Sequence, residues 1–372
     1  ISAMPQAHIH FDVINGAGLV TLDRPKALNA LTVEMVTDLR QVLLDWRDNP
    51  AISHVVIVSS APRAFCAGGD VRQARETIIA NGFDEADAFS VGEYLVDLAI
   101  AEFGKPIIAL CDGVVMGGGA GLAEHCTHII MSETTRFAMP ETSIGLFPDV
   151  GASMFLGRCP LPVARLLGMT GYIIHGADCM LLGLATSMVP SDQMEGLKRS
   201  LLDCTASEID QVIAGFKMDP GVPALNHQMP VIDRIFGGDV TPEQMQERAE
   251  DLARMRPNDK LVSHVITAFA TRCPVSIKLF WRLLQMANDI TDIGAALTLD
   301  YHLAMRMIRR GDYIEGVRAV LVDRDHAPWS RQTPIRNNVL CRFKEVFCDL
   351  IQYLSFTGNR TGQYHVKSRN SI

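Results

Sequence analysis

The sequence has no surplus of basic residues, no long apolar run and no paired-cysteine motif. Its 372 residues carry a net charge of −8, so no positive excess is available to neutralise nucleic-acid phosphates. No apolar stretch approaches the roughly 20 residues that a membrane-spanning helix needs. We therefore expect a globular protein that binds neither nucleic acid nor membrane.

Cysteine usage and the N-terminal residues bear on the compartment. The nine cysteines form no CxxC pair and no regular framework, and their odd number favours reduced thiols. The first residues show neither a secretory signal nor an Arg-rich amphipathic pattern. These features predict a cytoplasmic protein, and a mitochondrial-matrix protein that has lost its transit peptide is the alternative.

Strand and helix patterns alternate over residues 1–190 and predict an α/β core. Asn15-Gly16 separates two short strand-like segments and indicates a hairpin turn. Residues 31–47 follow a helical period. Three short apolar runs indicate buried strands, at 55–58, 107–110 and 129–131. Buried strands separated by helices are typical of a mostly parallel sheet.

Beyond residue 190 the strand signals give way to helical patterns. Long amphipathic or apolar periods occupy five segments, at 192–215, 242–256, 258–271, 275–287 and 293–310. We therefore expect a C-terminal helical region over 191–330. The tail over 331–372 has no clean period, and the sequence assigns it no role.

The segment 137–149 carries two carboxylates, Glu141 and Asp149, among apolar residues. A charged group is costly to bury, so each of these acids needs a partner or a chemical role. Pro140 and Pro148 stand beside the acids and indicate an ordered loop rather than a helix face. Two acids on one loop can present a base or a nucleophile to a single reacting atom.

Two glycine-rich turns lie upstream, each between a predicted strand and a helical stretch. The first is Ala64–Arg72, with Gly68-Gly69, and the second is Asp112–Leu122, with Gly117-Gly118-Gly119. Such turns expose backbone N–H groups, which at a helix start favour a developing negative charge. The second turn lacks both the ending of a P-loop and the spacing of a dinucleotide fingerprint. Together with the two-acid loop, the turns indicate acyl chemistry.

These three segments resemble the crotonase (enoyl-CoA hydratase/isomerase) superfamily, and within it the 3-hydroxyisobutyryl-CoA hydrolase group. The similarity is most specific over Phe137–Gly151, whose ending Gly-Leu-Phe-Pro-Asp-Val-Gly is similar to the hydrolase group. Further similar runs are Asp23–Leu31, Cys273–Lys278 and Glu315–Leu321. The resemblance covers about residues 10–330. It implies an α/β fold with a crotonase-like ββα spiral core and a C-terminal helical region.

The resemblance also implies a role for each loop. In this superfamily two backbone N–H groups bind the thioester carbonyl, and the matching residues here are Gly69 and Gly118. Hydratases of the family carry two catalytic glutamates, whose positions in this chain are Gly121 and Glu141. Because Gly121 has no carboxylate, simple water addition to an enoyl-CoA is disfavoured. The pattern Gly121, Glu141, Asp149 is similar to the hydrolases.

The resemblance thus implies an acyl-CoA thioester hydrolase that converts 3-hydroxyisobutyryl-CoA to 3-hydroxyisobutyrate and CoA in valine breakdown. Glu141 is expected to act either as a general base toward water or as a nucleophile that forms a mixed anhydride. Asp149 is expected to orient the 3-hydroxyl of the substrate or to share a proton with Glu141. An enoyl-CoA hydratase or isomerase is one alternative, and a non-catalytic scaffold with the crotonase fold is another.

Coenzyme A is expected as part of the substrate and not as a separate cofactor. The resemblance places it along two segments, which comprise Lys26, Ala27, Leu28, Ala67, Gly68, Asp70, Val71 and Arg72. Lys26 and Arg72 are candidate phosphate partners, and solvated surface bases are an equal alternative. Glu93 resembles a family position near the acyl pocket, but a surface glutamate on a helix is the interpretation that we favour.

Other chemistry-bearing residues give weaker signals. His125 and His128 lack an acidic third ligand, so no metal is expected. Cys66 has no nearby histidine in the sequence and is expected to be a small buried thiol. Crotonase relatives often form trimers or dimers of trimers through C-terminal helices. Residues 191–330 are therefore expected either to support a homo-oligomer or to cover the active site within one subunit.

Overall fold

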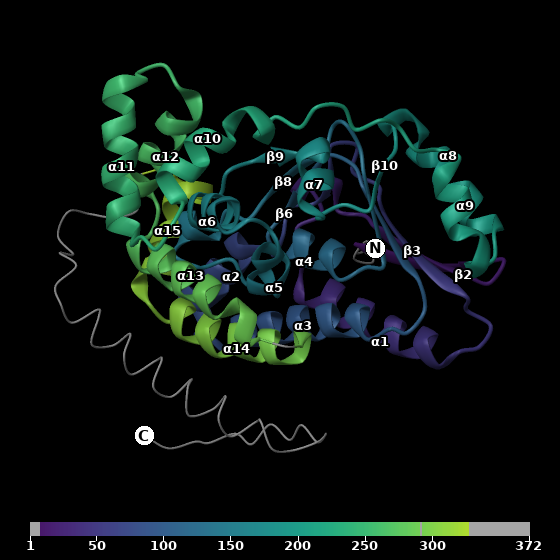
Figure 1. Cartoon of the computed structure of the whole chain (residues 1–372). Coiled ribbons are helices and arrows are strands. Elements are labelled where there is room, and N and C mark those ends of the chain that lie inside the picture. The colour runs from purple at the N-terminus through teal and green to yellow at the C-terminus, as the bar shows by residue number, and fades with distance from the viewer. Residues whose placement is uncertain (1–7, 291, 327–372) are drawn as a thin grey trace. The chain divides into compact units, whose positions relative to one another are not determined.

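The structure, a computed structural model, describes residues 8–290 and 292–326 (Figure 1). Its N-terminal hairpin forms as predicted, with β1 (Ile9–Ile14) antiparallel to β2 (Ala17–Leu22). Asn15 and Gly16 both adopt positive φ, 51° and 83°. Two successive positive φ angles are what a type I′ turn needs, which is why the Asn-Gly pair predicts this turn. The tail 331–372 and the predicted boundary at 330 lie outside the described residues.

A six-stranded sheet follows from the hairpin, in the order β1-β2-β3-β5-β7-β10. Every pairing beyond the hairpin is parallel. The added strands are β3 (His54–Ser59), β5 (Ile107–Cys111), β7 (His128–Met131) and β10 (Ser187–Met188). Three of them, β3, β5 and β7, are the apolar runs predicted as buried strands, so the mostly parallel sheet is confirmed.

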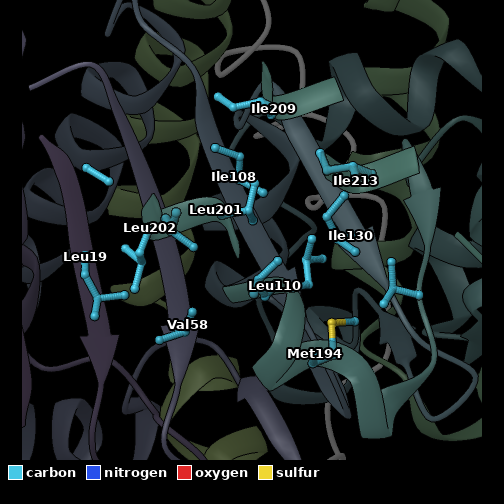
Figure 2. Close-up of a cluster of buried hydrophobic side chains, with 14 residues drawn as sticks. Leu19, Val58, Ile108, Leu110, Ile130, Met194, Leu201, Leu202, Ile209 and Ile213 are labelled. Atoms are coloured by element: carbon cyan, nitrogen blue, oxygen red, sulfur yellow. The ribbon is translucent and has the colours of Figure 1, made fainter. Parts of the chain in front are cut away.

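Helices cover both faces of this sheet, because side chains alternate between its faces and both sides are apolar. On one face, α8 (Met194–Asp203) and α9 (Ile209–Ala214) enclose a cluster of aliphatic side chains (Figure 2). The cluster includes Leu19, Val58, Ile108, Leu110, Ile130, Met194, Leu201, Leu202, Ile209 and Ile213. On the other face, α1 (Val33–Asp48) packs Trp46 against Gly18, where an added β-carbon would lie 2.5 Å from the indole.

A second, four-stranded sheet leads directly into the predicted loops. Its order is β4 (Ala64–Cys66), β6 (Val114–Met116), β8 (Arg136–Ala138) and β9 (Ile174–His175), and the first three strands are parallel. Each parallel strand ends just before one predicted loop. Since the carboxyl ends of parallel strands meet at one edge of a sheet, the three loops converge there. The sequence patterns did not resolve these three-residue strands from the loops that follow them.

Helices fill the rest of the described chain (Figure 1). Those around the site and its neighbours are α2 (Val71–Asn81), α3 (Asp84–Ala101), α4 (Gly118–Glu124), α5 (Ala152–Phe155), α6 (Leu161–Thr170), α7 (Gly176–Leu182) and α15 (Gly311–Val317). The other C-terminal helices are α10 (Leu225–Phe236), α11 (Pro242–Met255), α12 (Lys260–Thr271), α13 (Pro274–Met286) and α14 (Ile293–Ile308). α10, α12 and α13 pack on α6, whereas α14 packs on α3.

The helical predictions for the C-terminal region are confirmed for α11 to α14, with two exceptions elsewhere. The segment 192–215 is not one helix, because Thr205 and Glu208 form a capping box that starts a new helical turn after α8. The helix α10 was not predicted, since Pro230 lies inside it and interrupts the sequence signal.

Candidate functional site

The ends of β4 and β6 bring the two glycine turns together. A β-carbon added at Gly68, whose φ is 99°, would lie 3.0 Å from the Met116 carbonyl oxygen and 3.2 Å from the Gly118 nitrogen. A β-carbon at Gly118 would lie 3.6 Å from the Gly69 nitrogen. Neither the Gly69 nor the Gly118 N–H donates a hydrogen bond to another described residue. Both N–H groups are therefore free to bind one ligand oxygen, as an oxyanion hole requires.

Glu93 on α3 lies against the second turn. A β-carbon at Gly118 would fall 1.8 Å from Glu93 Oε1, so any side chain at this position would displace the carboxylate. Glu93 is only 6% exposed, and its Oε1 has no hydrogen-bond partner among the described residues. The interpretation of Glu93 as a surface glutamate is therefore wrong.

The burial of Glu93 follows from the packing of α3 against α1, α4 and α14. The buried stripe of α3 comprises Ala86, Ser90, Glu93, Asp97 and Ile100. These residues are spaced three or four apart, which is the period of one helix face. That period was the signal that could have placed Glu93 inside, but its polar members conceal it in a search for apolar residues.

Glu141 approaches the same turn from the other side. It opens η2 (Glu141–Ile144), a single 3-10 turn directly after β8. A β-carbon at Gly117, whose φ is 54°, would lie 2.9 Å from Glu141 Oε1. Consecutive Cα atoms are about 3.8 Å apart, so the carboxyl groups of Glu93 and Glu141 flank a single dipeptide, Gly117-Gly118. The structure thus places two acids beside the two free N–H groups.

Asp149 is the third acid of the cluster. The Tyr94 hydroxyl donates a hydrogen bond of 2.6 Å to Asp149 Oδ2. Asp300 on α14 holds the end of the loop, because its Oδ2 accepts a hydrogen bond of 2.8 Å from the Gly151 N–H. Asp149 is 7% exposed, and its charge acts on both Glu93 and Glu141. The predicted pair, Glu141 and Asp149, therefore belongs to one electrostatic unit with Glu93.

The three acids differ in their readiness to ionise. Burial raises the pKa of Asp149 to about 6, although the hydrogen bond from Tyr94 acts in the opposite direction. Burial, followed by the negative charge of Asp149, raises the pKa of Glu93 and of Glu141 well above the usual range. Asp149 is therefore the acid of the three that ionises most readily, whereas burial and the Asp149 charge favour the protonated forms of Glu93 and Glu141.

Gly121 lies one turn into α4, where the space for a side chain is already taken. A β-carbon at Gly121 would lie 2.8 Å from Val150 Cβ and 3.1 Å from Asp97 Oδ1. Burial and the charge of Glu93 raise the pKa of Asp97, whose two oxygens have no hydrogen-bond partner among the residues described. A glutamate at position 121 would therefore meet both a steric obstacle and another buried acid.

The two segments expected along coenzyme A lie side by side. The Ala67 N–H donates to the Leu28 carbonyl at 3.0 Å, and the Leu31 N–H donates to the Gly68 carbonyl at 2.8 Å. The Asp70 carboxylate is used within the protein, because it caps α2 and pairs with Arg24 at 2.7 Å.

The two basic residues on these segments lie at the surface. Lys26 is exposed, and Arg72 is largely exposed and pairs with Glu76 at 3.5 Å. A phosphate-binding role for either residue stays a prediction, as do the contacts of Ala27 and Val71.

The other candidate residues have structural roles. Cys66 is fully buried, its Sγ donates to the Asn29 carbonyl at 3.2 Å, and burial raises the pKa of its thiol to about 12. His125 is turned inward and hydrogen-bonds the Val150 carbonyl at 2.9 Å. Over residues 8–290 and 292–326 no three potential metal ligands come together. The helices in that part of the chain are too short or too polar to cross a membrane.

Sequence comparison identifies the family to which this arrangement belongs. Residues 17–338 match the enoyl-CoA hydratase/isomerase family over most of the chain. The chain belongs to this family of enzymes.

Several curated members of the family have similar sequences and bear the name of one activity. The chain is 32% identical to the mitochondrial 3-hydroxyisobutyryl-CoA hydrolase of Danio rerio, over 90% of this chain and 87% of the relative. It is 34% identical to the protein of the same name from Gallus gallus, over 84% and 81%. It is 33% identical to 3-hydroxyisobutyryl-CoA hydrolase 1 of Arabidopsis thaliana, over 87% and 86%.

Solved structures of family members share the fold. A carnitinyl-CoA dehydratase from Mycobacterium thermoresistibile matches with a TM-score of 0.81 and 29% identity, over 90% of this chain and 95% of the other. An enoyl-CoA hydratase from Rhodobacter sphaeroides 2.4.1 matches with a TM-score of 0.79 and 32% identity, over 88% and 93%. The predicted crotonase-type α/β fold with C-terminal helices is confirmed.

Proposed function

We propose that the protein is an acyl-CoA thioester hydrolase that converts 3-hydroxyisobutyryl-CoA and water to 3-hydroxyisobutyrate and CoA, a step of valine breakdown. The observation that carries this proposal is the placement of two free N–H groups, those of Gly69 and Gly118, beside the carboxyl groups of Glu93 and Glu141. The names of the curated relatives support the same activity.

The two N–H groups would bind the thioester carbonyl oxygen. As the carbonyl carbon becomes tetrahedral, negative charge develops on that oxygen, and fixed donors stabilise it without reorganising. One such donor contributes about 3–4 kcal/mol to the stability of a transition state. The glycines at 68 and 117 support this role, because their positive φ angles form the turns that present the N–H groups.

Glu141 would act in its ionised form, either as the base that takes a proton from water or as the nucleophile that forms a mixed anhydride. In both routes the C–S bond breaks and the thiolate of CoA leaves. Glu93, whose protonated form is favoured by burial and by the charge of Asp149, can protonate this thiolate. In the second route water then hydrolyses the anhydride, which releases 3-hydroxyisobutyrate and restores Glu141. Asp149 would keep its negative charge and orient the 3-hydroxyl of the acyl group.

A second candidate activity is hydration of an enoyl-CoA, because two solved relatives are named as a dehydratase and a hydratase. The obstruction at Gly121 argues against it, since no carboxylate can be built there without displacing Val150 or Asp97. The decisive comparison is thiol release from 3-hydroxyisobutyryl-CoA against loss of the enoyl absorbance of crotonyl-CoA. Hydration without thiol release would refute the hydrolase proposal.

Two single variants, each of which replaces one buried glutamate by glutamine, test the catalytic assignment. Glu141→Gln is expected to lower kcat about 10²–10⁴-fold, the usual contribution of a positioned acid–base group. Glu124→Gln is the matched control, because Glu124 is similarly buried but has Arg158, not the site acids, as its charged neighbour. Equal losses in both variants would show that any buried glutamate matters, and would refute a special role for Glu141.

Cofactor, compartment and assembly are proposals as well. No separate cofactor is invoked, because coenzyme A enters as part of the substrate. The vertebrate relatives are named mitochondrial, which favours the mitochondrial matrix over the cytoplasm for this protein. Fractionation of cells that express the full natural chain distinguishes the two compartments. A homo-oligomer through the C-terminal helices stays a prediction that sedimentation checks.

A further inference from the structure

The C-terminal helix α15 is fitted closely onto the catalytic loop. A β-carbon at Gly145 would lie 2.6 Å from the Asp312 carbonyl, and one at Gly316 would lie 2.6 Å from the backbone of Ile144. Both glycines therefore permit direct contact between the backbones of α15 and η2. These two contacts lie near the two ends of α15 and fix the helix with respect to Glu141, the first residue of η2.

A third contact ties α15 to the helix that follows the first glycine turn. Arg75 on α2 donates from Nε to the Ile314 carbonyl at 3.0 Å. The helix α15 is thus held against both the two-acid loop and α2, the helix that begins directly after the first glycine turn.

Tyr313 lies between these fixed points and is only 3% exposed. Burial raises the pKa of its phenol, and the charges of Asp149, Glu93 and Asp70 raise the pKa further. Asp149 and Glu93 belong to the acid cluster, whereas Asp70 directly follows Gly69. The β-carbon position of Gly145 also lies 2.9 Å from the Tyr313 backbone nitrogen, so this buried residue stands directly against the two-acid loop.

The Tyr313 hydroxyl forms no hydrogen bond with the residues at 8–290 and 292–326. It differs in this respect from Tyr94, the other tyrosine of the site, whose hydroxyl donates to Asp149. The Tyr313 hydroxyl is therefore not committed within the described part of the protein and is available to donate to a ligand oxygen. Tyr313 thus has the burial, the position and the unused donor of a substrate-binding group.

We propose that Tyr313 donates a hydrogen bond to the 3-hydroxyl oxygen of the acyl group and so selects 3-hydroxyacyl thioesters. The inference rests on the proposed hydrolase function and names its specificity residue. A substrate hydroxyl can donate one hydrogen bond and accept others. Asp149 accepts from it, because only one of the Asp149 oxygens is engaged by Tyr94, and Tyr313 donates to it. An acyl group without the hydroxyl leaves both protein groups unpaired, which is how a polar site rejects an analogue.

The test compares Tyr313→Phe with the wild type on two substrates of the same carbon skeleton, 3-hydroxyisobutyryl-CoA and isobutyryl-CoA. The variant removes one oxygen atom and keeps the buried aromatic ring. We expect kcat/KM to fall about 10- to 100-fold for the hydroxylated substrate and less than about twofold for isobutyryl-CoA. Tyr172→Phe is the control, since Tyr172 bonds Gln228 outside the acid cluster.

Each outcome decides the matter. Equal losses on both substrates would assign Tyr313 a purely structural role, and unchanged kinetics would remove it from the site. Either result overturns the inference and leaves the hydrolase proposal intact. Wild-type protein that hydrolyses isobutyryl-CoA as efficiently as the hydroxylated substrate would also overturn it. Wild-type protein that releases thiol from neither substrate would refute the proposed function itself, and the inference with it.

Discussion

Replacement of Asp149 by Asn should change how the stability of the protein depends on pH. The pKa of Asp149 is about 6 in the folded protein against an ordinary 3.8, because the carboxyl group is buried. The folded state therefore binds more protons than the unfolded state between these values, and stability is lost as pH rises through them. At 1.36 kcal/mol for each pKa unit, the folded protein loses about 3 kcal/mol of unfolding free energy through this group. Glu93 titrates together with Asp149, so this loss of unfolding free energy belongs to the two carboxyl groups jointly.

The measurement is the free energy of urea unfolding of both proteins at about pH 4 and about pH 8. Asn has almost the shape of Asp, and its side-chain oxygen can still accept the hydrogen bond from Tyr94, but it does not titrate. We expect the stability of the variant relative to the wild type to increase by about 2–3 kcal/mol over this pH range. Asp38→Asn on the exposed side of α1 is the control for loss of an aspartate. If the difference in unfolding free energy between the variant and the wild type stays constant with pH, or changes in the opposite direction, the reasoning is refuted.

Further predictions concern the glycine turns, the α15 contact and the pH profile. Gly118→Ala should lower kcat about 10²–10³-fold in thiol-release assays, because its β-carbon meets the carboxylate of α3 and displaces an oxyanion donor. Gly311→Ala, which has open space around it, should leave kcat unchanged. Gly316→Ala should lower the unfolding free energy in urea by about 1–3 kcal/mol, since its β-carbon meets the backbone of η2. For wild type, kcat/KM should rise with pH above the usual carboxylate range as Glu141 ionises, and in Asp149→Asn this rise should move to lower pH, because a negative neighbour has gone.

The sequence predicted the parts of the site that depend on local backbone chemistry. The turns at Gly68-Gly69 and Gly117-Gly118 are visible because glycine pairs follow buried strands, and parallel strands bring such turns to one edge. Glu141 and Asp149 are visible because charged residues stand out in an apolar segment. The hairpin at Asn15-Gly16 is visible for a similar reason, since few residue pairs accept two positive φ angles.

The parts that the sequence did not predict depend on contacts between distant segments. Glu93 was assigned to the surface because the helical period of its face is carried partly by polar residues, and that period does not show that α1, α4 and α14 enclose the helix. Tyr313 was overlooked because its neighbours in the site come from the middle and the first third of the chain. The obstruction at Gly121 is likewise invisible in sequence, since it arises from Val150 and Asp97 together. Burial of a polar residue is a property of the assembled fold, and local patterns record it poorly.

The contact between α15 and η2 also bears on the order in which the protein becomes competent during folding. Gly145 contacts Asp312, and Gly316 contacts Ile144, across a very long stretch of chain. Closing such a loop costs more conformational entropy than forming the hairpin at the N-terminus. The acids and the glycine turns can come together before this closure. The helix α15, which carries Tyr313, reaches the site only when the loop closes. Recovery of helical signal in a refolding experiment should therefore precede recovery of activity. A nascent chain of this protein would acquire its complete site only after α15 has been synthesised.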